Sequence, residues 1–275
     1  MLEALQFEFM RNALLAGLLT SVACGVIGTF VVVNRIVFLS GGIAHAAYGG
    51  IGLAFFFGLP FVVGTLGFAL LVAMVMAMVT LKAKHRADTI IGVLWAVGMA
   101  LGVILLDLTP GYNVDLMSFL FGSILAVTTS DLWLMLVLNI LILLTVGYFY
   151  HDFLALSYDE DFAKVRGVRV NLLYFLLLAM VALSVVMLIR IVGLILVIAL
   201  LTIPPYIAEK HSASLRTMMF LSFLLSCFFA IAGLWISYLF NLTSGATIIM
   251  VAGVCFFISL FFEMLRARRP FSSGN

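Results

Sequence analysis

Apolar runs long enough to cross a bilayer recur along almost the whole chain, and they constrain its fold more than any other feature. A helix needs roughly 20 apolar residues to span the hydrocarbon core of a membrane. Only 9% of the 275 residues are charged, which is too few for the surface of a soluble domain of this length. We therefore expect an all-α polytopic membrane protein with a single transmembrane domain over residues 1–275.

The runs predict about nine membrane-spanning helices, and eight is the alternative because the seventh is short. That seventh run comes after Arg190, which interrupts the apolar stretch. It contains Pro204 and Pro205, which we expect to break its hydrogen-bond ladder near the inner end and to bend the helix. Residues 115–127 are apolar but too short to span, which favours a half-inserted or re-entrant helix. The nine predicted spans are Asn12–Val33, Gly41–Gly58, Phe61–Leu81, Thr89–Leu108, Leu132–Tyr150, Leu172–Ile189, Ile191–Ala208, Thr217–Phe240 and Ala246–Phe262.

Basic residues indicate which way the helices run. With the loop around Lys84 on the cytoplasmic side and the spans alternating, all but two of the 14 basic residues fall on the inner side. The positive-inside rule predicts such a distribution, so we expect an outer N-terminus and a cytoplasmic C-terminus. The outer pair is Arg11 and Arg190, and the inner set is Arg35, Lys82, Lys84, Arg86, Lys164, Arg166, Arg169, Lys210, Arg216, Arg266, Arg268 and Arg269.

The second span carries His45, the one ionisable side chain that lies deep inside an apolar run. At helical spacing Gly41, His45, Tyr48 and Gly52 share a face, and such small residues let two helices approach closely. We expect two copies of this glycine-lined span to meet, with the imidazole lining a route for a cation. The alternative is a structural histidine that packs between helices.

The loop over residues 151–170 predicts a short helix on the cytoplasmic side. Ser157 and Glu160 have the spacing of a capping box, Lys164 suits the last turn, and Gly167 is placed to end the helix. Phe162, Ala163 and Val165 form its apolar side. One alternative is a solvated loop helix held by its neighbouring spans, and the other is a protruding helix that docks on a cytoplasmic partner. Capping signals at both ends of the helix favour docking.

Motifs for catalysis are missing from the sequence. It contains no Gly-Lys pair, and hence no Walker A loop, and it contains neither an H-E-x-x-H nor a G-x-S-x-G motif. We therefore expect a chain that is not an enzyme.

Five blocks in order resemble the permease family of zinc-, manganese- and iron-type metal ABC importers. N-R-I-V-F-L-S-G-G-I-A-H-A-A-Y-G-G is similar to the family's R-x-x-x-x-G-D-A-x-S-H-A-x-x-P-G segment. The others are D-L-M-S-F-L-F-G-S from Asp115, D-E-D-F-A-K-V-R-G-V from Asp159, V-G-L-I-L-V-I-A-L-L-T-I-P from Val192 and T-S-G-A-T-I-I near the end.

The resemblance implies a type II ABC importer-like permease fold in a bacterial inner membrane. It implies a homodimer of permeases, a cytoplasmic ABC ATPase, and an extracytoplasmic metal-binding protein that delivers a divalent ion. The bilayer surrounds the chain, no nucleic acid is expected as a partner, and no cofactor is expected to stay bound.

The resemblance also suggests roles for particular residues. His45 matches the family's intramembrane histidine, with Ser40 and Tyr48 as weaker candidates, but Gly41 stands where the family has an aspartate. Within the predicted ATPase-coupling helix it points to Asp159, Glu160, Phe162, Ala163 and Gly167. A secondary carrier or channel that works without an ATPase is the alternative function, and the motifs leave the ion undecided among zinc, manganese and iron.

Overall fold

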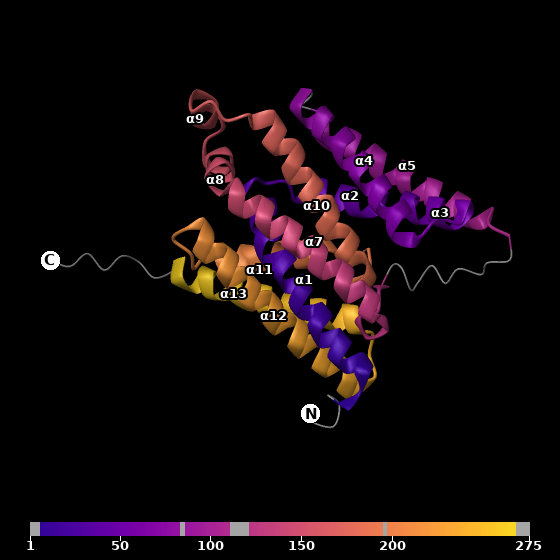
Figure 1. Ribbon diagram of the computed structural model, residues 1–275. Helices are drawn as coiled ribbons and strands as arrows, with labels where there is room; N and C mark the ends of the chain where they lie inside the picture. The colour runs from indigo at the N-terminus through magenta and orange to yellow at the C-terminus, as the bar shows by residue number, and fades with distance from the viewer. Residues whose placement is uncertain (1–5, 83–85, 111–120, 195–196, 268–275) are drawn as a thin grey trace.

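The computed structural model describes residues 6–82, 86–110, 121–194 and 197–267, and these residues form helices joined by short turns (Figure 1). No strand occurs among them, which confirms the all-α class. The helices are α1 (Glu8–Val33), α2 (Val37–Ala46), α3 (Tyr48–Phe57), α4 (Phe61–Lys82), α5 (Ala87–Asp107), the 3-10 turn η3 (Ile124–Ala126), α7 (Thr129–Tyr148), α8 (Tyr150–Tyr158), α9 (Glu160–Val165), α10 (Val170–Val192), α11 (Val197–Glu209), α12 (Leu215–Phe240) and α13 (Ser244–Ala267).

Eight of the described helical stretches are long and apolar enough to cross a membrane, with α2 and α3 counting together as one. This count leaves out α11, which has 13 residues and corresponds to the short seventh run. The expected span Ile191–Ala208 differs, because the backbone of α10 stays helical through residue 190 and turns only at Gly193, where φ is +80°. Beyond this turn lies α11, a helix of 13 residues and thus roughly 20 Å long.

Pro204 and Pro205 lie inside α11, where the sequence predicts a break in the hydrogen-bond ladder. The helix continues through both prolines to Glu209. Because Pro205 has no N–H, the carbonyl of Leu201 is free of its helical partner. That oxygen faces Gly28 of α1, where a Cβ would lie 2.7 Å from it, so the gap in the hydrogen-bond ladder is covered by a close helix contact.

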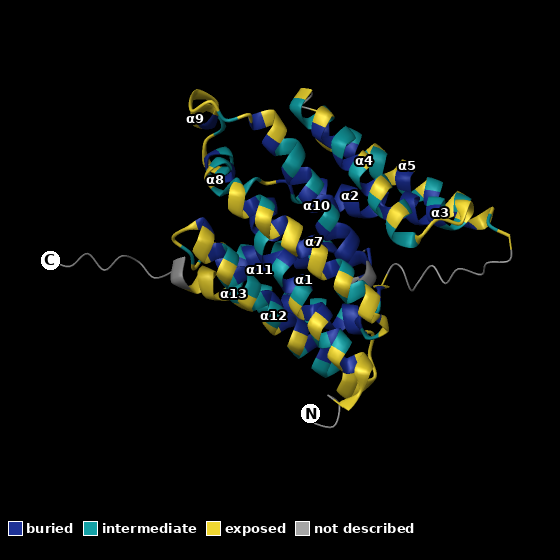
Figure 2. Ribbon diagram, viewed as in Figure 1, coloured by how far each residue is buried: buried dark blue, intermediate teal, exposed yellow. Residues whose placement is uncertain are grey.

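The helix α1 forms the centre of the molecule. It packs against α7, α10, α11 and α12, while α2 to α5 form a second group that joins it through α10 and α2 (Figure 1). Burial is greatest in the α2–α3 stretch, of which 83% is buried, against 67% of α1 and only 11% of α13 (Figure 2). The apolar side chains that α13, α5 and α7 leave exposed are those a bilayer would cover.

Loops predicted to share the inner side lie together at one end of the bundle, here called the α9 end. The α1–α2 turn, the start of α5, the α8–α9 segment and the α11–α12 loop all line one cavity there. An ion pair between Lys210 and Glu263, at 2.6 Å, brings the last turns of α13 to this end as well. Residues 115–120 of the predicted re-entrant piece over residues 115–127 lie outside the described residues; in the described part, Ile124–Ala126 form η3 against α1.

Candidate functional site

The histidine span is a helix interrupted at a single residue. It begins at Val37, four residues before the predicted start at Gly41, and Ala47 separates α2 from α3. Helical hydrogen bonds resume with the N–H of Gly50, which donates to the carbonyl of Ala47 at 2.9 Å. The interruption therefore falls two residues after His45.

Glycines of this span do allow a close helix approach, but the neighbours belong to the same chain. A Cβ at Gly50 would lie 2.7 Å from the carbonyl oxygen of Gly64 on α4, and one at Gly52 would lie 2.6 Å from that of Gly102 on α5. The expectation that two copies of the span meet through these glycines is therefore wrong. The small-residue face is filled by α4 and α5.

His45 lies inside this packing, with only 8% of its surface exposed. Its ring stacks on Trp95 of α5, with centroids 4.1 Å apart and planes 13° from parallel. The imidazole Nδ1 is buried and has no hydrogen-bond partner among the described residues. Burying a nitrogen without a hydrogen-bond partner lowers the stability of the folded protein. The placement of this imidazole is therefore not explained by folding stability alone.

The weaker candidates lie on the same span, Ser40 on α2 and Tyr48 at the start of α3, but they are not gathered around the imidazole. The Ser40 hydroxyl donates to the carbonyl of Val37 at 2.8 Å, within its own helix. The buried Tyr48 ring packs at Gly102, and Gly41 faces Ile198 of α11, whose Cδ1 would lie 2.6 Å from an added Cβ. Within the described residues no three His, Cys, Asp or Glu side chains come together as a metal site.

Trp95 is the neighbour that reasoning from the sequence did not identify. It is the single aromatic residue in the apolar run of α5, and that run does not indicate which residue its ring meets. The available signal was the spacing of Gly98 and Gly102, which predicts a helix-packing stripe, because Trp95 precedes Gly98 by about one turn on that stripe.

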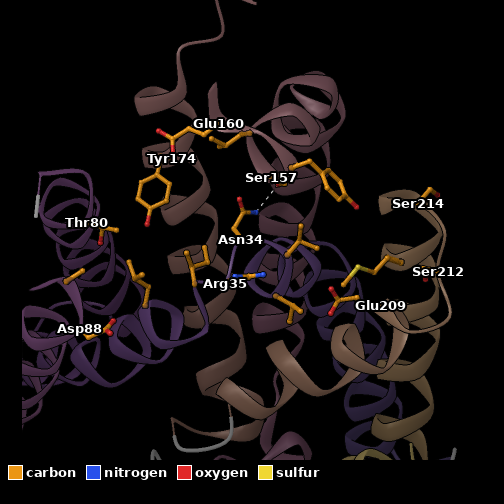
Figure 3. Close-up of a pocket in the computed structure, with 18 of the residues that line it drawn as sticks. Asn34, Arg35, Thr80, Asp88, Ser157, Glu160, Tyr174, Glu209, Ser212 and Ser214 are labelled. Atoms are coloured by element: carbon orange, nitrogen blue, oxygen red, sulfur yellow. Dashed lines mark hydrogen bonds between the residues drawn. The ribbon is translucent and has the colours of Figure 1, made fainter. Parts of the chain in front are cut away.

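A cavity of about 830 Å³ opens at the α9 end of the bundle (Figure 3). Its wall carries both signs of charge, with Arg35 on the α1–α2 turn, Asp88 on α5, Glu160 on α9 and Glu209 on α11. Arg35 adopts φ +57°, a left-handed conformation that is uncommon for a residue with a side chain. Leu39 also lines the cavity, so the cavity reaches α2 at a point roughly 9 Å along the helix from His45.

The segment α8–α9 forms one wall of that cavity and is tied to the α1–α2 turn. Asn34 donates its side-chain N–H to the Phe30 carbonyl at 2.9 Å and to the Ser157 hydroxyl at 3.0 Å (Figure 3). Ser157 is therefore not the N-cap of α9, as the capping-box prediction had it. Asp159 caps the helix instead, with its carboxylate accepting from the Phe162 N–H at 2.9 Å.

The other end of α9 is built as expected. Gly167 has φ +78°, and the N–H of Val168 donates to the Ala163 carbonyl at 3.0 Å, which are the features of a Schellman cap. Lys164 pairs with Glu160 at 2.8 Å, and hydrogen bonds to Glu160 and Asp161 raise the pKa of its ammonium group.

The predicted apolar side of α9 divides into an inner and an outer part. Ala163 is fully buried and packs with Ala155 and Val170, so it anchors the helix to the bundle. Phe162 and Val165 are 52% and 88% exposed, which leaves two apolar side chains projecting from the α9 end. A short, firmly capped helix thus presents an apolar tip.

Comparison with known proteins assigns this architecture to a family. The sequence pattern of the ABC 3 transport family matches residues 6–263. The chain belongs to the ABC 3 transport family. Membership confirms the resemblance drawn from the motifs and makes the chain a transport subunit rather than an enzyme, with ATP hydrolysis in a separate chain.

Individual members of the ABC 3 family match along nearly their whole length. An uncharacterized membrane protein of Synechocystis is 51% identical, over 96% of this chain and 94% of that one. The manganese transport system membrane protein MntC of Listeria innocua is 33% identical, over 94% and 92%. The solved structure of PsaBC from Streptococcus pneumoniae superimposes with a TM-score of 0.85 at 33% identity, over 94% and 93%.

Proposed function

We propose that the chain is the permease through which an ABC importer moves a divalent transition-metal ion into the bacterial cytoplasm, with manganese as the first candidate. The observation that carries the proposal is the match along more than nine tenths of both chains to MntC and PsaBC, at 33% identity. Zinc and iron are the other candidates that the family resemblance suggests.

In this proposal His45 lies on the ion's route and supplies one nitrogen ligand. Imidazole binds borderline metals, whereas manganese prefers oxygen, so the ion would keep much of its water or take backbone oxygens while passing. Weak, transient binding suits a transporter, because an ion that is held too firmly cannot leave. The cavity at the α9 end, which reaches Leu39 on the same helix, is the proposed exit.

We further propose that the α9 end faces the cytoplasm and that two permeases form a dimer with an ATPase beneath each. The tip formed by Phe162 and Val165 would dock on the ATPase, while Ala163 and the two caps hold α9 to the bundle. A soluble binding protein would deliver the ion at the opposite end.

Uptake of radioactive manganese by cells that carry the permease with its ATPase and binding protein tests the proposal. His45→Ala should lower uptake at least tenfold at unchanged protein level. His211→Ala, which changes an exposed histidine in the α11–α12 loop, is the matched control and should leave uptake unchanged. Full manganese uptake by His45→Ala would remove the imidazole from the route, and uptake without the ATPase would favour a secondary carrier or channel.

A further inference from the structure

A furrow runs along the bundle between α7 and α12 at the α9 end. Both helices pack against α1, but they do not pack against each other to a comparable extent, so α1 forms the floor (Figure 1). The resulting cavity is about 500 Å³, within the range of small-molecule sites. Its walls are apolar and include Val22 and Val26 from α1 and Phe220 and Phe223 from α12.

One wall of the furrow is open because α7 has a glycine there. Gly147 lines the cavity, and an added Cβ at this position would meet no atom within 4 Å. The space beside α7 is therefore present because residue 147 has no side chain. The helices α1, α7 and α12 that line the furrow are long and apolar enough to span a membrane. The apolar opening of the furrow is therefore available to a lipid or to a second copy of the chain.

The polar end of the furrow is a single cation. Arg216, in the first turn of α12, holds its guanidinium 4.6 Å from the ring centroid of Tyr150. No carboxylate of the described residues forms an ion pair with Arg216, and its side chain is exposed. The positive end of the α12 dipole lies at the same place, which further favours a negatively charged ligand.

We propose that this furrow binds an anionic phospholipid, with the lipid phosphate on Arg216 and one acyl chain along the α1 and α12 walls. A single positive group at the end of an apolar groove between spanning helices is complementary to such a lipid in both charge and shape. A helix of a second copy would fill the apolar part, but it would leave the guanidinium without an anion unless it also brought a carboxylate. Charge complementarity therefore favours the lipid.

Native mass spectrometry of the full chain in detergent tests the site, with phosphatidylglycerol and phosphatidylcholine of identical acyl chains as probes. The unchanged protein should retain phosphatidylglycerol about fivefold more than phosphatidylcholine, the factor expected for one arginine near a lipid headgroup. Arg216→Gln should abolish this preference, and Arg216→Lys should keep most of it. Gly147→Leu, which fills the furrow from its open side, should lower retention of both lipids.

Two control variants separate the furrow from general effects. Arg86→Gln removes another exposed cation, and Gly253→Leu fills open space beside α13, so both should behave like the unchanged protein. Equal retention of the two lipids by the unchanged protein, or a preference that survives Arg216→Gln, would overturn the proposal. Disulfide-linked dimers of Phe220→Cys in membranes, absent from the unchanged chain, would assign the furrow to a second copy and also overturn it.

Discussion

The indole of Trp95 determines how the imidazole of His45 is held. The two rings are stacked at 4.1 Å, and the indole N–H is directed to the sulfur of Met99 at 3.2 Å, about one turn further along α5. The indole is thereby fixed to its own helix and offers a flat, rigid surface to α2. An ion that binds the imidazole would meet a ring whose plane is already set, which lowers the entropy lost on binding.

Replacing Trp95 should therefore affect both transport and stability. Trp95→Leu removes the stack and should lower manganese uptake several-fold and stability by about 1 kcal/mol, the scale of an aromatic pair. Trp95→Phe keeps an aromatic ring, so its uptake and its stability should lie between those of the unchanged protein and those of Trp95→Leu. Uptake in cells and thermal unfolding in detergent measure the effects, with Trp133→Leu, an exposed tryptophan on α7, as the control. Unchanged uptake by Trp95→Leu would show that the stack does not serve transport.

At the scale of single residues, the sequence identifies a residue whose chemistry differs from that of its surroundings. It does not identify a residue whose role depends on a neighbouring helix. His45 could be found because it is ionisable within an apolar run. Trp95 was not found, because the glycine stripe beside it predicts a packing face without identifying the helix, some 50 positions away, that meets it. The cap of α9 shows the same limit: Ser157 and Asp159 are both good caps, and the hydrogen bond from Asn34 to Ser157 decides between them.

Among the elements, the α2–α3 span is held by backbone contacts that only glycine permits. At Gly52 an added Cβ would lie 2.6 Å from the Gly102 carbonyl oxygen, a distance that backbone atoms cannot relieve by rotating a side chain. Local glycine spacing predicted close packing, and close packing is present. The partner helix was predicted wrongly, because the pattern is equally suited to contacts within and between chains.

A pair of glycine variants tests this packing. Gly52→Ala should lower stability by about 1–3 kcal/mol, as overpacking does in a filled interior. Gly67→Ala on α4, where an added Cβ meets nothing within 4 Å, should be neutral or stabilising by up to about 1 kcal/mol, because alanine favours the helix. Thermal unfolding of the purified chain compares them, and equal midpoints would contradict close α3–α5 contact.

The helix α9 allows a separate test of coupling, because its outward side chains do not hold it in place. Phe162→Asp changes a half-exposed tip residue, so the chain should still fold, while co-purification of the ATPase should be lost. Phe7→Asp alters a residue that is 53% exposed before α1 and serves as the control. Retention of the ATPase by Phe162→Asp at normal yield would exclude this tip as the docking site.

For the whole molecule, the two ends of the bundle are defined by contacts between residues far apart in the sequence. Asn12 near the start of α1 donates to the Val127 carbonyl at 3.4 Å, whereas Glu209 shares the cavity at the α9 end with Glu160. Charge distribution predicted this grouping of loops. The boundary between α10 and α11 could not be predicted, because Arg190 breaks the apolar pattern while the turn itself falls at Gly193.

Orientation in the membrane can be inferred from the same grouping. A fluorescent protein fused after Asn275 should fluoresce, and alkaline phosphatase fused after Asn241 should be active, because the positive-inside rule places the basic α9 end in the cytoplasm. Reversal of the Asn275 reporter alone would mean that α13 does not cross the membrane. Reversal of both reporters would mean that the whole bundle is inverted or that α11 does not return across the membrane, which would put Arg216 and Glu160 on opposite sides. Since the first turns of α12 and α9 line one cavity at the α9 end, that last outcome would contradict the fold itself.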